Sequence, residues 1–193
     1  TRQRRQLGLG HAILSARSVV MDQPFVVALG DSIIGVHAKS KVVKQMIDLF
    51  EQLQADAVIA FEEVPREEVN RYGIATVGKE HGGYFELADL VEKPDVEEAP
   101  SRLAVASRYV FRGELFEYLE NTATGKGNEI QLTDAISTWI RAGGRVFGIP
   151  LADGEQRFDI GNFPSYFKAF FEFASQDPKY GASFLEFVRQ RTV

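Results

Sequence analysis

The sequence predicts an α/β fold in which a mostly parallel central sheet carries an antiparallel insertion and helices cover both faces. Short apolar runs, typical of buried strands, alternate along the chain with longer stretches whose apolar residues recur at helical spacing. A glycine pair, Gly82 and Gly83, separates two further strand-like runs and indicates a hairpin. The alternation predicts the layered sheet, and the glycine pair predicts the antiparallel insertion.

The first third of the chain supplies two helices and two strands of this fold. Residues 9–20 follow a glycine turn and are predicted to be helical. Residues 24–29 form a continuous apolar run, which predicts a strand buried on both faces. Residues 40–53 place apolar side chains at helical spacing, and residues 57–61 form a second buried strand.

The rest of the chain completes the sheet and ends in helices. The hairpin strands are residues 72–77 and 84–91, and a further strand covers residues 104–111. Gly143 and Gly144 end an amphipathic helix, as glycine commonly does. The remaining expected elements are helices at residues 113–119, 131–142, 164–174 and 182–190 and a strand at residues 146–151.

Composition limits the class of protein. The chain has 193 residues, 45% of them hydrophobic, which is enough for one sizeable core, so we expect one domain over residues 1–193 with C-terminal helices at 163–193. The net charge of −5 argues against a nucleic-acid partner, and no apolar run approaches the roughly 20 residues that span a membrane. The chain has no cysteine, which excludes thiolate catalysis and fits a reducing compartment, and no signal peptide is visible. We therefore expect a cytoplasmic protein.

Two aspartates follow strand-like runs far apart in the sequence. Asp31 follows the apolar run 24–29, and Asp159 lies in the segment 157–161. In open α/β sheets, ligands bind at the carboxyl ends of the strands, and two carboxylates can hold a hard divalent cation. The alternatives are a turn residue for Asp31 and a helix cap for Asp159.

Further candidate residues surround a strand end and a helix start. Glu92 and Lys93 end the second hairpin strand, where strand alternation would send their side chains to opposite faces; they are either ligand-binding residues or an edge charge pair. Gly8 precedes a helix whose N-terminus suits an anion. For His11 and Asp134 we favour structural roles, the second as a helix-start residue.

In this order, the motifs resemble those of the bacterial UTP–glucose-1-phosphate uridylyltransferases, or UDP-glucose pyrophosphorylases. The resemblance runs from about Gln3 to Phe173. It rests on the segments Gly8-Leu9-Gly10-His11-Ala12, Leu29-Gly30-Asp31, Tyr72-Gly73, Val91-Glu92-Lys93-Pro94, Ala99-Pro100-Ser101, Arg108-Tyr109, Glu129-Ile130-Gln131-Leu132-Thr133-Asp134-Ala135 and Asp159-Ile160-Gly161-Asn162.

The resemblance implies a nucleotide-diphospho-sugar transferase (Rossmann-like) fold and an enzyme that forms UDP-glucose and pyrophosphate from UTP and glucose 1-phosphate. It implies that Asp31 and Asp159 bind Mg²⁺ and, with Lys93, form the catalytic set. Nucleotide binding would fall to Gln3, which would read uracil, and to the Gly8 backbone. The implied sugar-phosphate residues are Gly73, Glu92, Lys93 and Val105.

The sequence also departs from the family pattern. The family's Gly-x-Gly-Thr-Arg loop, which cradles the triphosphate, is missing from these 193 residues, and we expect a chain without it to bind UTP poorly. Phe163 stands where the family usually has lysine, which would weaken phosphate binding. Ser107 and Asn128 stand where the family usually has glycine.

Two rival functions stay open at this point. One is a nucleotidyltransferase-like binding or regulatory module that has lost catalysis, and the other is an enzyme that uses another nucleotide or another sugar 1-phosphate. The aromatic residues that follow Ser165 are expected to form core or a subunit contact, and we expect a homo-oligomer.

Overall fold

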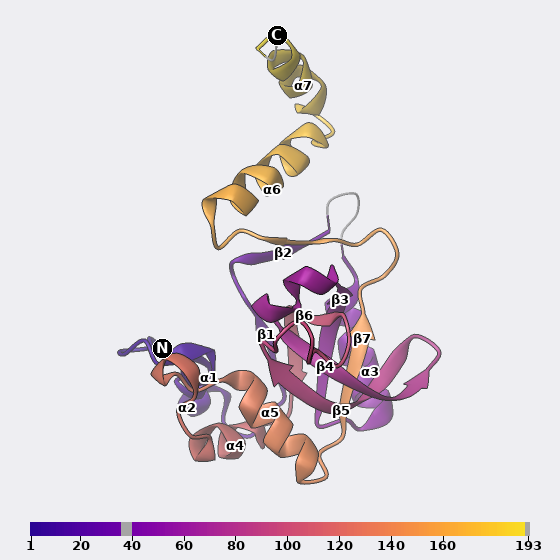
Figure 1. The fold of residues 1–193 in the computed structure, drawn as a ribbon. Helices are drawn as coiled ribbons and strands as arrows, with labels where there is room; N and C mark the ends of the chain where they lie inside the picture. The colour runs from indigo at the N-terminus through magenta and orange to yellow at the C-terminus, as the bar shows by residue number, and fades with distance from the viewer. Residues whose placement is uncertain (36–39, 192–193) are drawn as a thin grey trace. The chain divides into compact units, whose positions relative to one another are not determined.

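A six-stranded mixed sheet is the centre of the first part of the chain (Figure 1). The structure is a computed structural model, and it describes residues 1–35 and 40–191. Contacts divide the chain into two compact units, unit 1 (Thr1–Ala28 and Val42–Pro150) and unit 2 (Leu29–Lys41 and Leu151–Val193). The expectation of one nucleotidyltransferase domain over the whole chain stays a prediction.

The sheet of unit 1 confirms the α/β class and corrects the strand directions. Its order is β1-β6-β3-β7-β5-β4. β3 and β7 pair in parallel, whereas the other described pairings in this sheet are antiparallel, so the expected mostly parallel sheet is wrong for these strands. The strands are β1 (Phe25–Ala28), β3 (Ala57–Glu63), β4 (Gly73–His81), β5 (Tyr84–Glu92), β6 (Leu103–Phe111) and β7 (Val146–Pro150).

Helices cover both faces of this sheet, as the sequence predicted. Residues 57–61 of β3 are all buried, because β3 lies between β6 and β7 and has helices on both sides. Ala57, Ile59 and Phe61 pack into one core with α4 (Leu115–Asn121) and α5 (Leu132–Arg141). The alternate side chains, Val58 and Ala60, point to the other face, where α3 (Val42–Leu53) contacts the strand.

The hairpin is confirmed, and the first strand is corrected. β4 and β5 pair antiparallel across Gly82 and Gly83, and Gly83 has a φ of +101°, which glycine adopts without steric cost. β1 was expected to be buried on both faces, but its residues alternate between partly buried and exposed, with Val26 42% exposed. The reason is its place at the edge of the sheet, where it pairs with β6.

The helix expected at residues 9–20 is two helices, α1 (Gly8–Leu14) and α2 (Arg17–Val20). The break lies at Ser15, whose hydroxyl donates to the His11 carbonyl at 2.8 Å. Such side-chain bonds to the backbone compete with regular helix geometry. Unit 1 also contains the short 3₁₀ helices η1 (Arg66–Arg71) and η2 (Lys126–Asn128).

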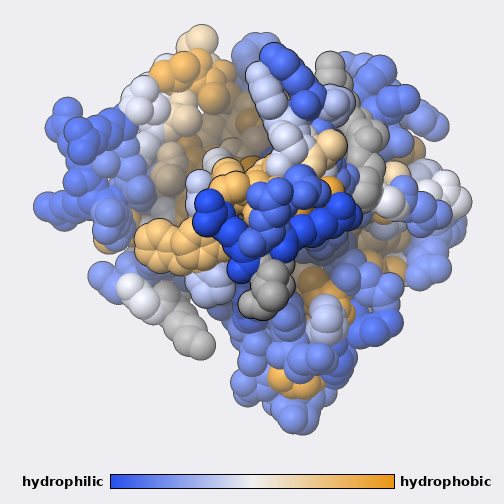
Figure 2. Space-filling model, turned by 90° about the horizontal axis from the view of Figure 1, so that it is seen from above, coloured by the Kyte–Doolittle hydropathy of each residue, from blue (hydrophilic) through white to orange (hydrophobic). Residues whose placement is uncertain are grey.

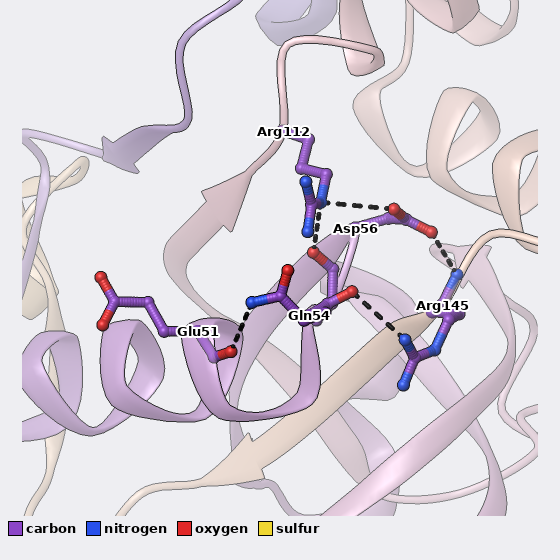
Figure 3. Close-up of polar contacts among 6 residues, drawn as sticks. Glu51, Gln54, Asp56, Arg112 and Arg145 are labelled. Atoms are coloured by element: carbon purple, nitrogen blue, oxygen red, sulfur yellow. Dashed lines mark hydrogen bonds and ion pairs between the residues drawn. The ribbon is translucent and has the colours of Figure 1, made fainter.

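Asp56 joins three chain segments at the start of β3 (Figure 3). Its carboxylate accepts from the Arg145 backbone N–H at 2.7 Å and lies 3.5 Å from Arg112 Nε. Arg112 Nε also donates to the Ala55 carbonyl, and Arg145 donates to the carbonyl of Gln54. These contacts fix the start of β7 and the end of β6 against the start of β3, away from the strand ends that carry Glu92.

Unit 2 contains a two-stranded sheet that the sequence did not predict. β2 (Ser32–Ile34) pairs antiparallel with β8 (Arg157–Asp159), and the helices α6 (Phe163–Ser175) and α7 (Gly181–Arg189) follow. Large apolar side chains of both helices are exposed, and orange patches interrupt the blue surface in Figure 2. The exposed side chains include Phe163 and Phe187 as well as Tyr166, Phe167, Phe170 and Phe171 of the aromatic run after Ser165. The core alternative for that run is therefore wrong for these last four residues, whereas Phe173 is partly buried. In the described part of the chain, no helix is both long and apolar enough to cross a membrane.

Candidate active site

Asp31 and Asp159, which we call the aspartate pair, are brought together inside unit 2 by the β2–β8 pairing. Asp159 ends β8 opposite Ser32, and the Ile160 N–H donates to the Asp31 carbonyl at 2.7 Å. Asp159 Oδ1 accepts from the Gly161 N–H at 2.8 Å. A Cβ atom placed on Gly161 would lie 3.1 Å from Asp159 Oδ1 and 3.4 Å from Asp31 Oδ2. The two carboxylates are therefore neighbours beside Gly161.

The helix-cap alternative for Asp159 is wrong. The residue that caps α6 is Asn162, whose side-chain oxygen accepts from the Ser165 N–H at 3.1 Å. Asp31 does lie in a turn, because the Ser32 N–H donates to the Leu29 carbonyl at 3.3 Å. A turn position leaves its exposed carboxylate available to a ligand.

The chemistry of the aspartate pair fits a magnesium ion. Mg²⁺ prefers oxygen ligands and is usually held by one or two carboxylates, with water and substrate phosphates completing the octahedron. Within residues 1–35 and 40–191, no cluster of three or more His, Cys, Asp or Glu side chains is arranged to hold a metal. The two neighbouring carboxylates match the number of protein ligands that such a site usually has.

A second group of predicted residues meets in unit 1, and we call it the Glu92 cluster: Gly73, Glu92, Lys93 and Val105, with Thr133. Lys93 Nζ lies 3.4 Å from Glu92 Oε1, and the Thr133 hydroxyl donates to Glu92 Oε2 at 2.9 Å. A Cβ on Gly73 would lie 2.8 Å from Thr133 Cγ2 and 3.4 Å from Val105 Cγ2. The structure thus brings the four predicted residues together and adds Thr133, which the sequence reasoning missed.

Lys93 corrects the expectation that strand alternation separates it from Glu92. It lies just beyond the end of β5 and has a φ of +44°, so the alternation does not extend to it. Its N–H donates to the Tyr72 carbonyl at 2.9 Å, and Pro94 follows. A left-handed backbone is uncommon for a residue other than glycine, and such strain clusters at functional sites. Here it turns Lys93 back beside Glu92.

Gln3 and Gly8 also lie together, as their expected roles require. Gln3 Nε2 donates to the Gly8 carbonyl at 3.2 Å and lies 2.8 Å from His11 Nδ1. Gly8 has a φ of +88°, and a Cβ there would lie 2.7 Å from Glu129 Cβ. The contact gives His11 a structural partner, and it fixes the carboxamide of Gln3.

Next to the Glu92 cluster, two aspartates at the β5–α5 contact have opposite pKa shifts. Burial acts to raise the pKa of Asp89, but hydrogen bonds from Ser137, Arg141 and the Leu90 N–H outweigh it and hold the pKa below its ordinary value. Burial and the nearby Glu92 charge raise the pKa of Asp134, against a smaller effect of Arg141. Asp134 lies in the first turn of α5, as expected of a helix-start residue. Both carboxylates line a cavity of about 340 Å³ with Glu92.

Comparison with known proteins decides the family. The profile of the Nucleotidyl transferase family matches residues 1–176. The chain belongs to the nucleotidyl transferase family. This membership confirms the predicted nucleotidyltransferase fold. Nucleotidyltransferases of this kind generally use a divalent metal ion.

The chain is similar over nearly its whole length to bacterial proteins of one named activity. It is 38% identical over 189 residues to a UTP–glucose-1-phosphate uridylyltransferase of Staphylococcus epidermidis and 39% identical to one of Staphylococcus haemolyticus. Each alignment covers 98% of this chain and 64% of the relative. The chain thus spans a little under two thirds of the length of these curated relatives.

Solved structures of this nucleotidyltransferase type have the same fold. A UDP-glucose pyrophosphorylase complexed with UDP-glucose is 39% identical, with a TM-score of 0.81 over 88% of this chain and 62% of that one. The UTP-bound UGPase from Acinetobacter baumannii is 36% identical, with a TM-score of 0.84 over 97% of this chain and 64% of that one. The family resemblance read from the motifs is confirmed by these relatives.

Proposed function

We propose that this nucleotidyltransferase chain belongs to an enzyme that forms UDP-glucose and pyrophosphate from UTP and glucose 1-phosphate. The observation that carries the proposal is the Glu92 cluster, in which a carboxylate and an ammonium group stand side by side at the end of β5. That arrangement suits a small ligand with both hydroxyls and a phosphate. The named activity of the staphylococcal relatives supports the choice of substrates.

In the proposed reaction, a phosphate oxygen of glucose 1-phosphate attacks the α-phosphorus of UTP. The new P–O bond forms as the bond to the β-phosphate breaks, and pyrophosphate leaves. Catalysis of this type depends on alignment of the reactants and neutralisation of phosphate charge. A bound Mg²⁺ would supply the Lewis acid, and Asp31 and Asp159 would hold it through their carboxylates.

Each remaining residue has a role that its surroundings support. Lys93, about half exposed, offers its ammonium group to the phosphate of glucose 1-phosphate, and Glu92 accepts hydrogen bonds from sugar hydroxyls. Gly73 and Val105 lie beside Glu92, where they would contact the sugar. The carboxamide of Gln3 reads uracil, and Gly8 lets the backbone approach the base.

Location and assembly belong to the same proposal. The cysteine-free sequence is compatible with the reducing cytoplasm, and the exposed aromatic side chains of α6 and α7 support a homo-oligomer. Sedimentation of the purified protein over a range of concentrations measures the second point, and a single monomeric species would contradict it.

The test of activity is pyrophosphate release from UTP and glucose 1-phosphate with Mg²⁺ by the purified natural gene product. A panel with dTTP, CTP and other sugar 1-phosphates separates this activity from that of an enzyme with another substrate pair. The other rival function is a binding module without turnover. Phe163, which is 76% exposed at the start of α6, should weaken phosphate binding in either case, because the family usually has lysine there. Tight UTP binding without pyrophosphate release from any pair would favour that rival and contradict the proposed enzyme.

A further inference from the structure

Thr133 touches two of the predicted sugar-binding residues at once. It lies in the first turn of α5 and is only 7% exposed. Its hydroxyl donates to Glu92 Oε2 at 2.9 Å, and its methyl carbon lies 2.8 Å from the place where a Cβ on Gly73 would be. One buried side chain thus links a helix to the end of β5 and the start of β4.

The hydroxyl of Thr133 determines how Glu92 can face a ligand. Glu92 is held through both carboxylate oxygens, by Thr133 at Oε2 and by Lys93 at Oε1. If the bond to Thr133 is removed, the ammonium group of Lys93 is the stronger remaining attraction for the carboxylate. Glu92 would then turn toward Lys93, which leaves less of the positive charge of Lys93 for a phosphate.

The methyl group of Thr133 has a separate effect. It occupies the space beside Gly73 that a side chain at that position would need. The methyl group therefore lies next to the backbone of Gly73, so the hydroxyl and the methyl act on different parts of the Glu92 cluster.

We propose that Thr133 is a positioning residue for sugar-phosphate recognition, acting through Glu92 and Gly73 rather than by touching the substrate. This inference rests on the proposed function, because it assigns Thr133 to the sugar-phosphate half of that substrate pair. Thr133 is not among the described neighbours of the nucleotide residues Gln3 and Gly8, which contact each other and lie beside His11, Glu129 and Ile130. Loss of the Thr133 side chain should therefore weaken binding of the glucosyl part of a ligand and leave binding of the uridine part unaffected.

Two substitutions separate the hydroxyl from the methyl. Thr133→Val keeps the methyl and removes the donor, and Thr133→Ser keeps the donor and removes the methyl. Titration calorimetry of the purified natural gene product with UDP-glucose and with UDP gives the affinity that the glucosyl group adds. We expect T133V to lower the affinity for UDP-glucose about tenfold and to leave the affinity for UDP unchanged. The reason is that a hydrogen bond to a charged group contributes about 1.5 kcal/mol or more. T133S should restore most of the UDP-glucose affinity.

Steady-state kinetics gives the matching readout. In T133V, KM for glucose 1-phosphate should rise while KM for UTP stays unchanged, a split that general damage to the fold would not produce. Ser137→Ala is the matched control, because Ser137 lies one turn later on α5 and donates to Asp89 instead of Glu92. We expect S137A to leave the affinity for UDP-glucose unchanged. If T133V does not fold, Thr133→Ala replaces it, because it removes the hydroxyl without adding a methyl group. We expect T133A also to lower the affinity for UDP-glucose and to leave the affinity for UDP unchanged.

The outcomes distinguish this inference from the proposed function. A wild-type protein that bound UDP but not UDP-glucose would contradict both. A wild-type protein that bound UDP-glucose, together with a T133V variant that bound it equally well, would overturn the role of Thr133 alone. The role would also be overturned if T133S lost as much affinity as T133V, or if T133V weakened UDP and UDP-glucose equally.

Discussion

The aspartate pair and the Glu92 cluster hold their charges in different ways. In the Glu92 cluster, the carboxylate faces an ammonium group at 3.4 Å and accepts a hydroxyl at 2.9 Å, so most of its charge is balanced within the protein. The aspartate pair brings two carboxylates together beside Gly161, and the contact that fixes Asp159 comes from a backbone N–H. The first arrangement balances its charge internally, whereas the second has the carboxylates that our proposal assigns to a divalent cation.

The difference indicates a division of labour. In the proposed function, the Glu92 cluster binds the sugar phosphate through Glu92 and Lys93, and the aspartate pair holds a metal ion that binds the phosphates of UTP. Because the clusters lie in different units of the chain, changes in one should affect its own ligand and spare the other.

The largest expected effect is on the aspartate pair. We expect Asp31→Asn and Asp159→Asn each to lower turnover by about a hundred- to a thousandfold, because a Lewis acid contributes several kcal/mol of charge stabilisation to phosphoryl transfer. Pyrophosphate release at several magnesium concentrations measures this. Circular dichroism checks that the fold is retained, and a normal rate at saturating magnesium would remove that aspartate from the metal site.

A smaller effect, on the other side of the comparison, is expected for Lys93→Ala. A charge-assisted contact to phosphate contributes roughly 1.5–3 kcal/mol, so affinity for glucose 1-phosphate should fall about ten- to a hundredfold. The affinity for UTP should stay within about twofold of the wild-type value, because the substitution removes only the contact with the phosphate of glucose 1-phosphate. An equal loss of affinity for UTP and for glucose 1-phosphate would show that the two clusters are not independent.

A third prediction concerns backbone strain close to the Glu92 cluster. Ser107 lies two residues after Val105 in β6, with a φ of +58° at the point where the β3–β6 register shifts. We expect Ser107→Gly to raise the free energy of unfolding by up to about 1 kcal/mol, because the left-handed conformation costs roughly that much for a residue with a Cβ. Urea denaturation measures the change.

Asn128→Gly is the control for this strain, because Asn128 has a nearly equal φ of +59° and asparagine tolerates that conformation better than serine. Its stabilisation should be smaller than that of S107G. A destabilised S107G variant would mean that the Ser107 side chain contributes more than its backbone costs.

The smallest expected effects are the pH dependences of two variants at the β5–α5 contact. The pKa of Asp89 is lowered in the folded protein, so its stabilisation is present above the ordinary pKa of about 3.9 and is lost as pH falls through the folded value. Ser137→Ala removes one of the bonds that lower it. We expect S137A to destabilise the protein at pH 7 and to approach the wild type in acid.

Asp134 should show the opposite sign. Its pKa is raised in the folded protein, so ionisation disfavours folding as pH rises above the ordinary value of about 3.9 and through the folded value. We therefore expect Asp134→Asn to be more stable than the wild type at pH 7 and equal to it below about pH 3. Urea midpoints at several pH values would measure both variants, and a D134N variant that gained stability in acid would contradict the assigned shift.

The sequence predicted the central part of unit 1 well, and the physical reason is local. The all-apolar run at residues 57–61 and the glycine turn at residues 82–83 each carry their own structural signal, and both predictions are confirmed. Strand direction is not local, since an apolar run looks the same in a parallel and an antiparallel pair. The exposed face of β1 was not predicted for the same reason, because the position of a strand at the edge depends on the order of the whole sheet.

The candidate site divides along the same line. Glu92 and Lys93 are adjacent in the sequence and formed a recognisable motif, although the positive φ of Lys93 placed them closer than strand alternation predicts. Thr133 was missed because its contact with Glu92 crosses 41 positions, and its helix-start pattern gave no sign of a partner. Finding it would have required knowing that α5 packs against β5.

The antiparallel pairing of β2 with β8 also sets a time order on folding. Asp31 leaves the ribosome early, but its partner strand is made roughly 130 residues later, about 10 s at the usual rates of synthesis. Most strands and helices of unit 1 are made during that interval, although its last strand, β7, ends at Pro150, shortly before β8 begins. The first segment of unit 2 lacks its partner strand until β8 is made. Closing so long a loop comes late on entropic grounds as well. We therefore expect Asp31 and Asp159 to come together late in synthesis, after every residue of the Glu92 cluster has been made.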